Sequence, residues 1–171
     1  MLRALILLLA LAGPAAAAAV PAGIPLWEGA ETGMTTEEVL QAFPEATPVP
    51  KGERAGKEGP AGGELRVTIE RVALGPDPYA ARFYFGRSGL QRVILDRHLE
   101  GDMAFSRGLK LAGRVRDAMS EHYGEPVTRE TGGDGYMVTW RQDAKRVRLV
   151  VITQSYEVKS FQVVYEPRPQ D

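Results

Sequence analysis

The residue types that act as nucleophiles, bases or metal ligands do not occur at the spacings that such chemistry needs. The chain has two histidines, and neither His98-x-Glu100 nor Glu121-His122 reproduces the His-Glu-x-x-His spacing that places two imidazoles on one helix face. It has no cysteine, and no serine lies in a Gly-x-Ser-x-Gly turn. We therefore predict a noncatalytic protein without cofactor or metal, in which His122 lies at a helix C-terminus.

Arginine and tyrosine alternate with apolar residues in several strand-like segments. Successive side chains of a strand point to opposite faces, so these polar residues should gather on the sheet face away from the core. Guanidinium groups and tyrosine rings are common at protein interfaces. An ordinary solvated sheet face would show the same pattern. The candidate partner-binding residues are Arg66, Arg82, Tyr84, Arg92, Arg141, Arg146, Arg148 and Gln162.

Six segments have the apolar and polar alternation of half-buried strands. In the first of them Leu65, Val67 and Ile69 share one face, and turn residues such as Gly86-Arg87-Ser88-Gly89 separate the segments. The predicted strands are Glu64–Val72, Tyr79–Phe85, Leu90–Arg97, Tyr136–Arg141, Arg146–Thr153 and Val158–Glu166.

Two helices precede these groups of strands. Thr35 and Glu38 have the spacing of a capping box, and Pro44 ends the short helix that follows. The second helix should begin after Asp102 or Ser106 and end near Tyr123. Its apolar stripe has helical spacing and comprises Leu111, Val115, Ala118, Met119 and His122.

The order helix, strand, strand, strand therefore occurs twice. We predict an α+β fold built as a tandem repeat of a helix followed by three antiparallel strands, with the helices packed on one face of the sheet. Residues 47–63, rich in Pro and Gly, are predicted to form a mobile surface loop. The expected divisions are 1–19 signal peptide, 20–32 extended N-terminal segment, 33–98 first module, 99–167 second module and 168–171 C-terminal tail.

The N-terminus has the pattern of an export signal. Arg3 supplies a positive charge, residues 4–12 are apolar, and Gly13-Pro14 precedes the small residues of Ala15–Ala19, where cleavage is expected. An uncleaved membrane anchor is the alternative, but a spanning helix needs about 20 apolar residues. We predict a periplasmic (bacterial) or secreted protein with no stable membrane anchor after cleavage.

The composition narrows the partners further. The chain of 171 residues has 21 basic and 22 acidic residues, a balance that argues against sequence-independent binding of nucleic acid. Without cysteine it cannot form disulfides or carry the N-terminal lipid of a bacterial lipoprotein. We expect an envelope protein as its partner.

Three short motifs resemble a known family. They are Gly33-Met34-Thr35-Thr36-Glu37-Glu38-Val39, Tyr123-Gly124-x-Pro126, and the hairpin from Phe83-x-Phe85 to Gly89-Leu90. They look like segments of the SmpA/OmlA outer-membrane assembly family, whose fold is similar to the tandem modules of the β-lactamase inhibitor protein. The resemblance implies a protein-binding module that acts in envelope assembly or as an enzyme inhibitor.

A carrier of small apolar ligands is the second hypothesis. It would hold a ligand between the helices and the sheet, near Trp27, Met119, Met137 and Trp140. The same residues could simply form core, which is the more common use of methionine and aromatic side chains.

Overall fold

The computed structural model describes residues 22–54, 62–74, 77–97, 103–132 and 135–169. The predicted signal peptide and its cleavage site lie outside these ranges, as do His98 and Asp102. Neither of the two α-helices in the described ranges is long and apolar enough to cross a membrane.

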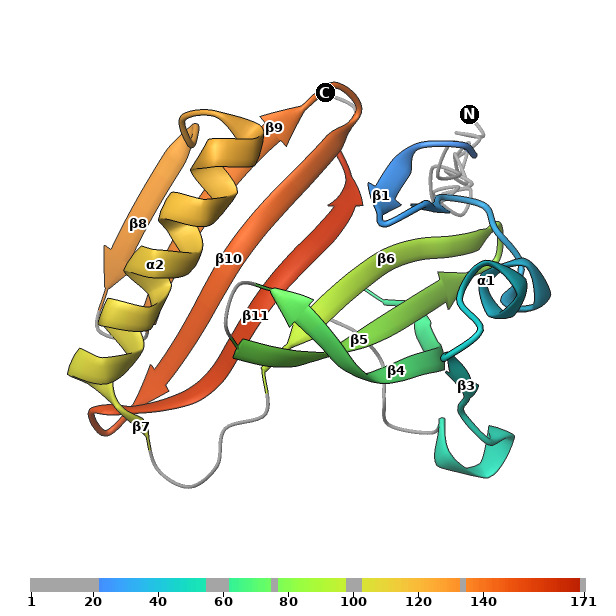
Figure 1. Cartoon of the computed structure of the whole chain (residues 1–171), viewed down its shortest axis with the longest axis horizontal. Helices are drawn as coiled ribbons and strands as arrows, with labels where there is room; N and C mark the ends of the chain where they lie inside the picture. The colour runs from blue at the N-terminus through green and yellow to red at the C-terminus, as the bar shows by residue number, and fades with distance from the viewer. Residues whose placement is uncertain (1–21, 55–61, 75–76, 98–102, 133–134, 170–171) are drawn as a thin grey trace, which may run out of the picture.

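Most of the described chain belongs to one antiparallel sheet of nine strands (Figure 1). The strands lie in the order β3-β4-β5-β6-β11-β10-β9-β8, and β7 pairs with β11. Their bounds are β3 Thr47–Pro48, β4 Glu64–Leu74, β5 Asp77–Gly86, β6 Gly89–Asp96, β7 Met103–Ala104, β8 Thr128–Gly132, β9 Gly135–Gln142, β10 Lys145–Gln154 and β11 Glu157–Pro167.

The expected tandem repeat of two helix-and-three-strand modules is wrong. β6 pairs with β11, so that Val93 lies opposite Tyr165 and Leu95 opposite Val163, and the strands of both halves form a single sheet. The helices also differ in size, with 7 residues in α1 (Thr36–Ala42) and 19 in α2 (Phe105–Tyr123). Alternation along a sequence indicates strands but not which edges they share, and the shared edge here merges the two halves.

The segment before α1 is more than the extended lead-in that the sequence predicts. Strands β1 (Pro25–Trp27) and β2 (Ala30–Glu31) form a small hairpin closed by Glu28 and Gly29, both of which have positive φ. The Trp27 ring stacks on Phe43 with 5.7 Å between ring centroids. The hairpin therefore covers one end of the core.

The predicted surface loop is also partly wrong. Thr47 and Pro48 form β3 against β4, a short 3-10 helix η1 follows at Lys51–Glu53, and Val49 between them is buried. Residues 55–61 of the predicted loop lie outside the described ranges. The pairing of β3 with β4 and the burial of Val49 hold this Pro-rich segment against the sheet.

Helix α1 begins as its sequence predicts. The Glu38 amide donates to Thr35 Oγ1 over 3.2 Å, and the Thr35 amide donates to Glu38 Oε2 over 2.7 Å, which confirms the capping box. Helix α2 instead follows Ala104, without a side-chain cap. The predicted N-cap at Ser106 is therefore wrong, because Ser106 lies inside the helix.

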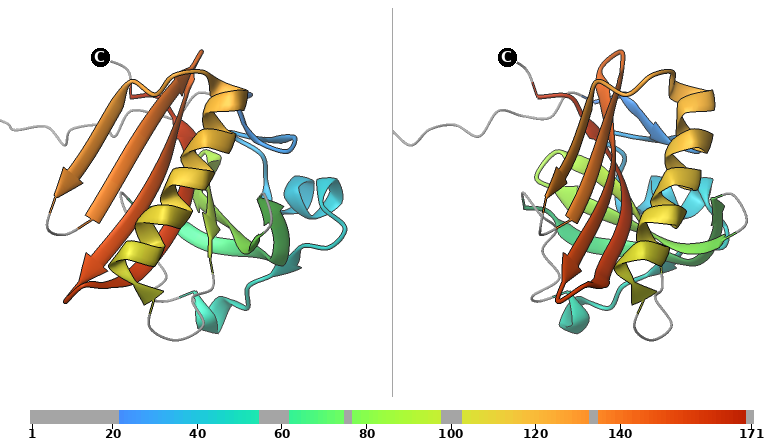
Figure 2. Two further views of the ribbon diagram at one scale, coloured as in Figure 1. Left: turned by 60° about the vertical axis from the view of Figure 1, so that its left-hand side comes forward. Right: turned by 90° about the vertical axis from the view of Figure 1, so that its left-hand side faces the viewer.

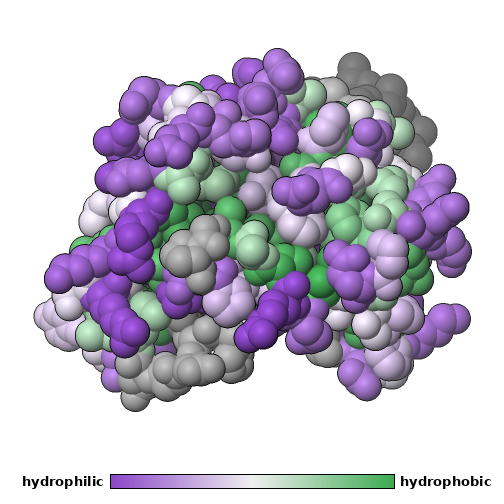
Figure 3. Space-filling model, viewed as in Figure 1, coloured by the Kyte–Doolittle hydropathy of each residue, from purple (hydrophilic) through white to green (hydrophobic). Residues whose placement is uncertain are grey.

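Both helices contribute to one apolar core. The same buried cluster contains the inward side chains of β4, β5, β6, β9, β10 and β11. From the helices it includes Val39 of α1, Phe43 at the C-cap of α1, and Leu111, Val115 and Met119 of α2. On this side of the molecule, apolar surface lies in the middle and polar side chains surround much of it (Figure 3). The opposite side of the sheet carries the polar residues predicted to bind a partner, except Arg66, which lies over Phe85 of this core.

Candidate partner-binding surface

The side of the sheet that faces away from α2 carries no helix over β9, β10 and β11 in the described ranges (Figure 2). We call this surface the open face. At its centre lies a second, smaller apolar cluster formed by Val49, Leu65, Tyr84, Ile94 and Val164. All five residues are buried, so they form an apolar centre beneath the polar side chains of the open face.

Three of the predicted arginines meet at a buried carboxylate. Glu166 on β11 has a side chain that is 4% exposed, and it accepts hydrogen bonds from Arg92, Arg146 and Arg148. Arg146 Nη2 and Arg148 Nη2 lie 2.7 and 2.8 Å from Oε1, and Arg92 Nη2 lies 2.8 Å from Oε2. We call these four residues the Glu166 cluster.

The strand register explains how the Glu166 cluster forms. Arg146 lies directly opposite Glu166 in the ladder between β10 and β11, and Arg148 lies opposite Val164, one step along the same face. Arg92 comes from β6 on the other side of β11. A single acidic side chain therefore receives guanidinium groups from both neighbouring strands.

The Glu166 cluster holds more positive than negative charge. Arg146 and Arg148 both depend on the same oxygen of this carboxylate, Oε1. Burial lowers the pKa of Arg148, because its charge is partly removed from water. Arg148 Nε is buried and has no hydrogen-bond partner among the residues that the structure describes, so this donor is unsatisfied there.

A second polar group crosses three strands beside the apolar centre. Arg82 on β5 forms an ion pair of 2.9 Å with Asp96 on β6, and Gln162 on β11 donates to Asp96 over 3.4 Å. Tyr84 lies next to Arg82 on the same face and is buried, which raises the pKa of its hydroxyl. Arg82 and Gln162 are thus brought together through Asp96, with Tyr84 beside Arg82.

Two of the predicted residues form no ion pair with Glu166 or Asp96 in the described ranges. Arg141 is exposed on β9, directly opposite Arg146. Arg66 sits where the register of β4 shifts between Leu65 and Val67, and its guanidinium lies 5.6 Å from the ring centroid of Phe85, a residue of the helix-side core. The irregularity separates Arg66 from the other candidate residues.

The sequence reasoning missed the two acids that organise the arginines. Glu166 follows Gln162 and Val164 at intervals of two, and Asp96 has the same relation to Arg92 and Ile94. Both acids therefore share a face with residues that had been selected. Alternation places both acids on this face, but it does not show which strands bring the arginines to them.

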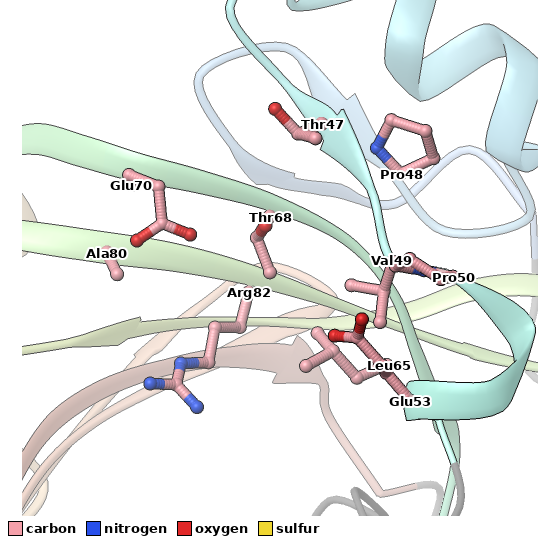
Figure 4. Close-up of a pocket in the computed structure, with 10 residues that line it drawn as sticks. All are labelled: Thr47, Pro48, Val49, Pro50, Glu53, Leu65, Thr68, Glu70, Ala80 and Arg82. Carbon is pink, nitrogen blue, oxygen red and sulfur yellow. The ribbon is translucent and has the colours of Figure 1, made fainter.

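A cavity of about 300 Å³ opens at the β3 end of the open face (Figure 4). Val49 and Leu65 form part of its wall, and Arg82 joins it to the polar group around Asp96. Its complete lining is Thr47, Pro48, Val49, Pro50, Glu53, Leu65, Thr68, Glu70, Ala80 and Arg82. The cavity makes one end of the open face concave.

The residues proposed for a ligand carrier lie on different sides of the sheet. Trp140 is fully buried, and its Nε1 lies 3.3 Å from Ser120 Oγ of α2. Met119 and Trp27 also pack in the helix-side core. Met137 lies between Tyr136 and Val138 of β9, which belong to that core, so its side chain points to the open face.

Residues with possible catalytic roles are dispersed in the described ranges. No group of three or more His, Cys, Asp or Glu side chains that could hold a metal ion occurs there. His122 lies in the last turn of α2, and its ring contacts Tyr123 edge to face. Tyr79, beneath the helices, has a buried hydroxyl without a hydrogen-bond partner, and burial raises its pKa to about 12.

Comparisons with known proteins leave the family open. No family model matches the chain, and no curated protein matches it. Among solved structures, the chain is similar to a DUF4309 family protein (YjgB) from Bacillus subtilis, with 14% identity, a TM-score of 0.41, and coverage of 78% of each chain.

Proposed function

We propose that the protein is a noncatalytic protein-interaction module of the bacterial envelope, which binds a partner through the open face of its sheet. The observation that carries this proposal is the convergence of Arg92, Arg146 and Arg148 on one buried carboxylate. The export pattern of the N-terminus supports a periplasmic or secreted location. Envelope assembly and enzyme inhibition are the two roles that the motif resemblance suggests.

The composition of the open face fits this function. Ile152 on β10 is 48% exposed on the same face as Arg146 and Arg148, and Val150 and Met137 pair across the strands beside it. Apolar side chains next to arginine and tyrosine are typical of the central part of protein interfaces. The concavity beside Arg82 gives the same face a place for a projecting side chain.

Affinity capture from a periplasmic extract tests the proposal. The mature protein serves as bait beside Ile152→Asp, which adds a charge on the open face, and Ala118→Asp, which changes an exposed position of α2. We expect a captured partner to be lost with Ile152→Asp, because a buried unpaired charge at an interface is costly, and to be kept with Ala118→Asp. Equal capture by all three baits would contradict the proposal.

A further inference from the structure

The excess positive charge of the Glu166 cluster requires a physical explanation. Arg146 and Arg148 both donate to the same carboxylate oxygen, and their Nη2 atoms lie 2.7 and 2.8 Å from it. Two guanidinium groups bound to one carboxylate leave a net positive charge at this place, although each is attracted to the carboxylate. A second anion would neutralise that charge.

Arg141 increases the positive charge at the surface of the Glu166 cluster. It lies opposite Arg146 in the ladder between β9 and β10, so the two side chains project from the same face. Like charges directly opposite each other destabilise a sheet. Arg141 is exposed, whereas Arg148 has a side chain that is 24% exposed, so the charge extends from a half-buried layer to the solvent.

Arg148 supplies the most specific evidence for a bound anion. Its Nη2 donates to Glu166, while its Nε is buried and has no acceptor. A guanidinium group has donors on several edges, and two of them can grip one carboxylate in a bidentate manner. The Nε–H of Arg148 thus has no acceptor in the described ranges, but it is buried, so an oxygen atom of a partner would meet the exposed part of the Arg148 side chain beside it.

The surroundings decide which kind of anion fits. Val150 follows Arg148 on β10 at the interval that keeps both on the open face, and Ile152 comes next. Met137 lies opposite Val150 on β9. An anion bound at Arg148 would thus have apolar neighbours on one side, which suits an acidic side chain within an apolar protein segment better than an isolated ion.

We propose that the partner contributes a carboxylate group from an acidic segment, and that this group binds to Arg146 and Arg148 with Arg141 at its solvent side. The inference rests on the proposed function and adds the chemistry of the partner. Glu166 holds the guanidinium groups in place before the partner arrives, so less side-chain freedom is lost on binding.

Nuclear magnetic resonance of the arginine Nε–H groups tests this site in the purified mature protein. The probe is a synthetic peptide of alternating glutamate and leucine, and the control peptide has glutamine in place of glutamate. We expect the glutamate peptide to shift the Arg148 Nε–H signal in a saturable way. The signals of Arg116 and Arg129, which pair with acids away from the open face, should stay in place.

Variants test whether the arginines are needed to bind the glutamate peptide. Arg148→Gln should weaken the affinity for the glutamate peptide about tenfold, in line with the loss of a hydrogen bond between charged groups. Arg141→Gln replaces an exposed side chain, so it tests the same prediction without disturbing the buried carboxylate. Arg129→Gln is the matched control and should leave the affinity unchanged.

Three results would overturn the inference. They are the absence of a saturable shift at Arg148, equal binding of the glutamine peptide, and a shift produced by inorganic phosphate but not by the glutamate peptide. The capture experiment distinguishes a failure of this inference from a failure of the proposed function. If capture is lost with Ile152→Asp but kept with Arg148→Gln and Arg141→Gln, the interaction surface stands and the carboxylate site does not.

Discussion

At the scale of single residues, Glu166 is the group on which the arrangement of the arginines depends. Glu166→Gln should lower the free energy of unfolding by about 3–5 kcal/mol, because it leaves three guanidinium groups close together without a buried anion. Urea denaturation followed by circular dichroism measures the change. Glu125→Gln is the control, since Glu125 pairs with Arg129 at the surface and should contribute less than about 1 kcal/mol. Similar losses in both variants would contradict this role for Glu166.

We expect the buried hydroxyl of Tyr79 to make the protein less stable at alkaline pH. Its folded pKa of about 12 lies above the ordinary value of 10.0, so the unfolded chain ionises first. The stabilisation is complete below pH 10 and is lost as the pH rises from 10 to 12, by up to roughly 2–3 kcal/mol.

Tyr79→Phe tests this effect. The variant removes a buried hydroxyl that has no partner, so it should be at least as stable as the wild type at pH 7 and should decline less between pH 10 and 12. Thermal melts at a series of pH values measure the difference. Tyr156→Phe, at a position that is 88% exposed, should behave as the wild type. A Tyr79→Phe profile that follows the wild type would show that Tyr79 is not responsible.

At the scale of elements, the sequence predicts the long strands well and the short ones poorly. The predicted strand Glu64–Val72 corresponds to β4 at Glu64–Leu74, because alternating side chains make one face of it apolar. Strand β8 at Thr128–Gly132 has no large apolar residue and is exposed throughout. Backbone hydrogen bonds to β9 hold β8 in place. Such bonds do not depend on side-chain type, so they produce no alternation in the sequence.

Two glycines of α2 provide a matched test of its packing. A Cβ at Gly108 would lie 2.2 Å from Val158 Cγ2, whereas a Cβ at Gly113 would meet no atom within 4 Å. Gly113→Ala should therefore stabilise the protein by about 0.5–1 kcal/mol through helix propensity. Gly108→Ala should destabilise it by roughly 1–3 kcal/mol, because α2 must move away from β11. Chemical denaturation of both variants compares them, and equal stabilisation would contradict the close contact.

At the scale of the whole molecule, the continuous sheet predicts a single cooperative unit. The pairing of β6 with β11 joins strands that the sequence assigned to separate modules, and side chains from both halves share one core. Sequence alternation could not reveal this, because partners 66 to 74 residues apart, such as Gln162 and Asp96 or Arg92 and Glu166, meet only once the sheet is complete. The open face could be predicted from alternation, but the Glu166 cluster could not.

The two tryptophans report on the cooperativity of unfolding. Trp27 packs near Phe43 and Phe83, and Trp140 lies beneath α2. In each of the variants Trp27→Phe and Trp140→Phe, the urea midpoint from the remaining tryptophan should coincide with the midpoint from circular dichroism. Midpoints that differ between the two signals within one variant would indicate that the halves unfold separately.

The most direct test of the interaction surface is site-specific photo-cross-linking in cells that export the protein. A photoreactive amino acid is placed at Ile152 on the open face or at Ala118 on α2, both of which are exposed. We predict a discrete cross-linked protein species from Ile152 that is absent from Ala118 and is weakened by Arg148→Gln. Cross-links of equal yield from both positions, or from Ala118 alone, would contradict a partner-binding role for the open face.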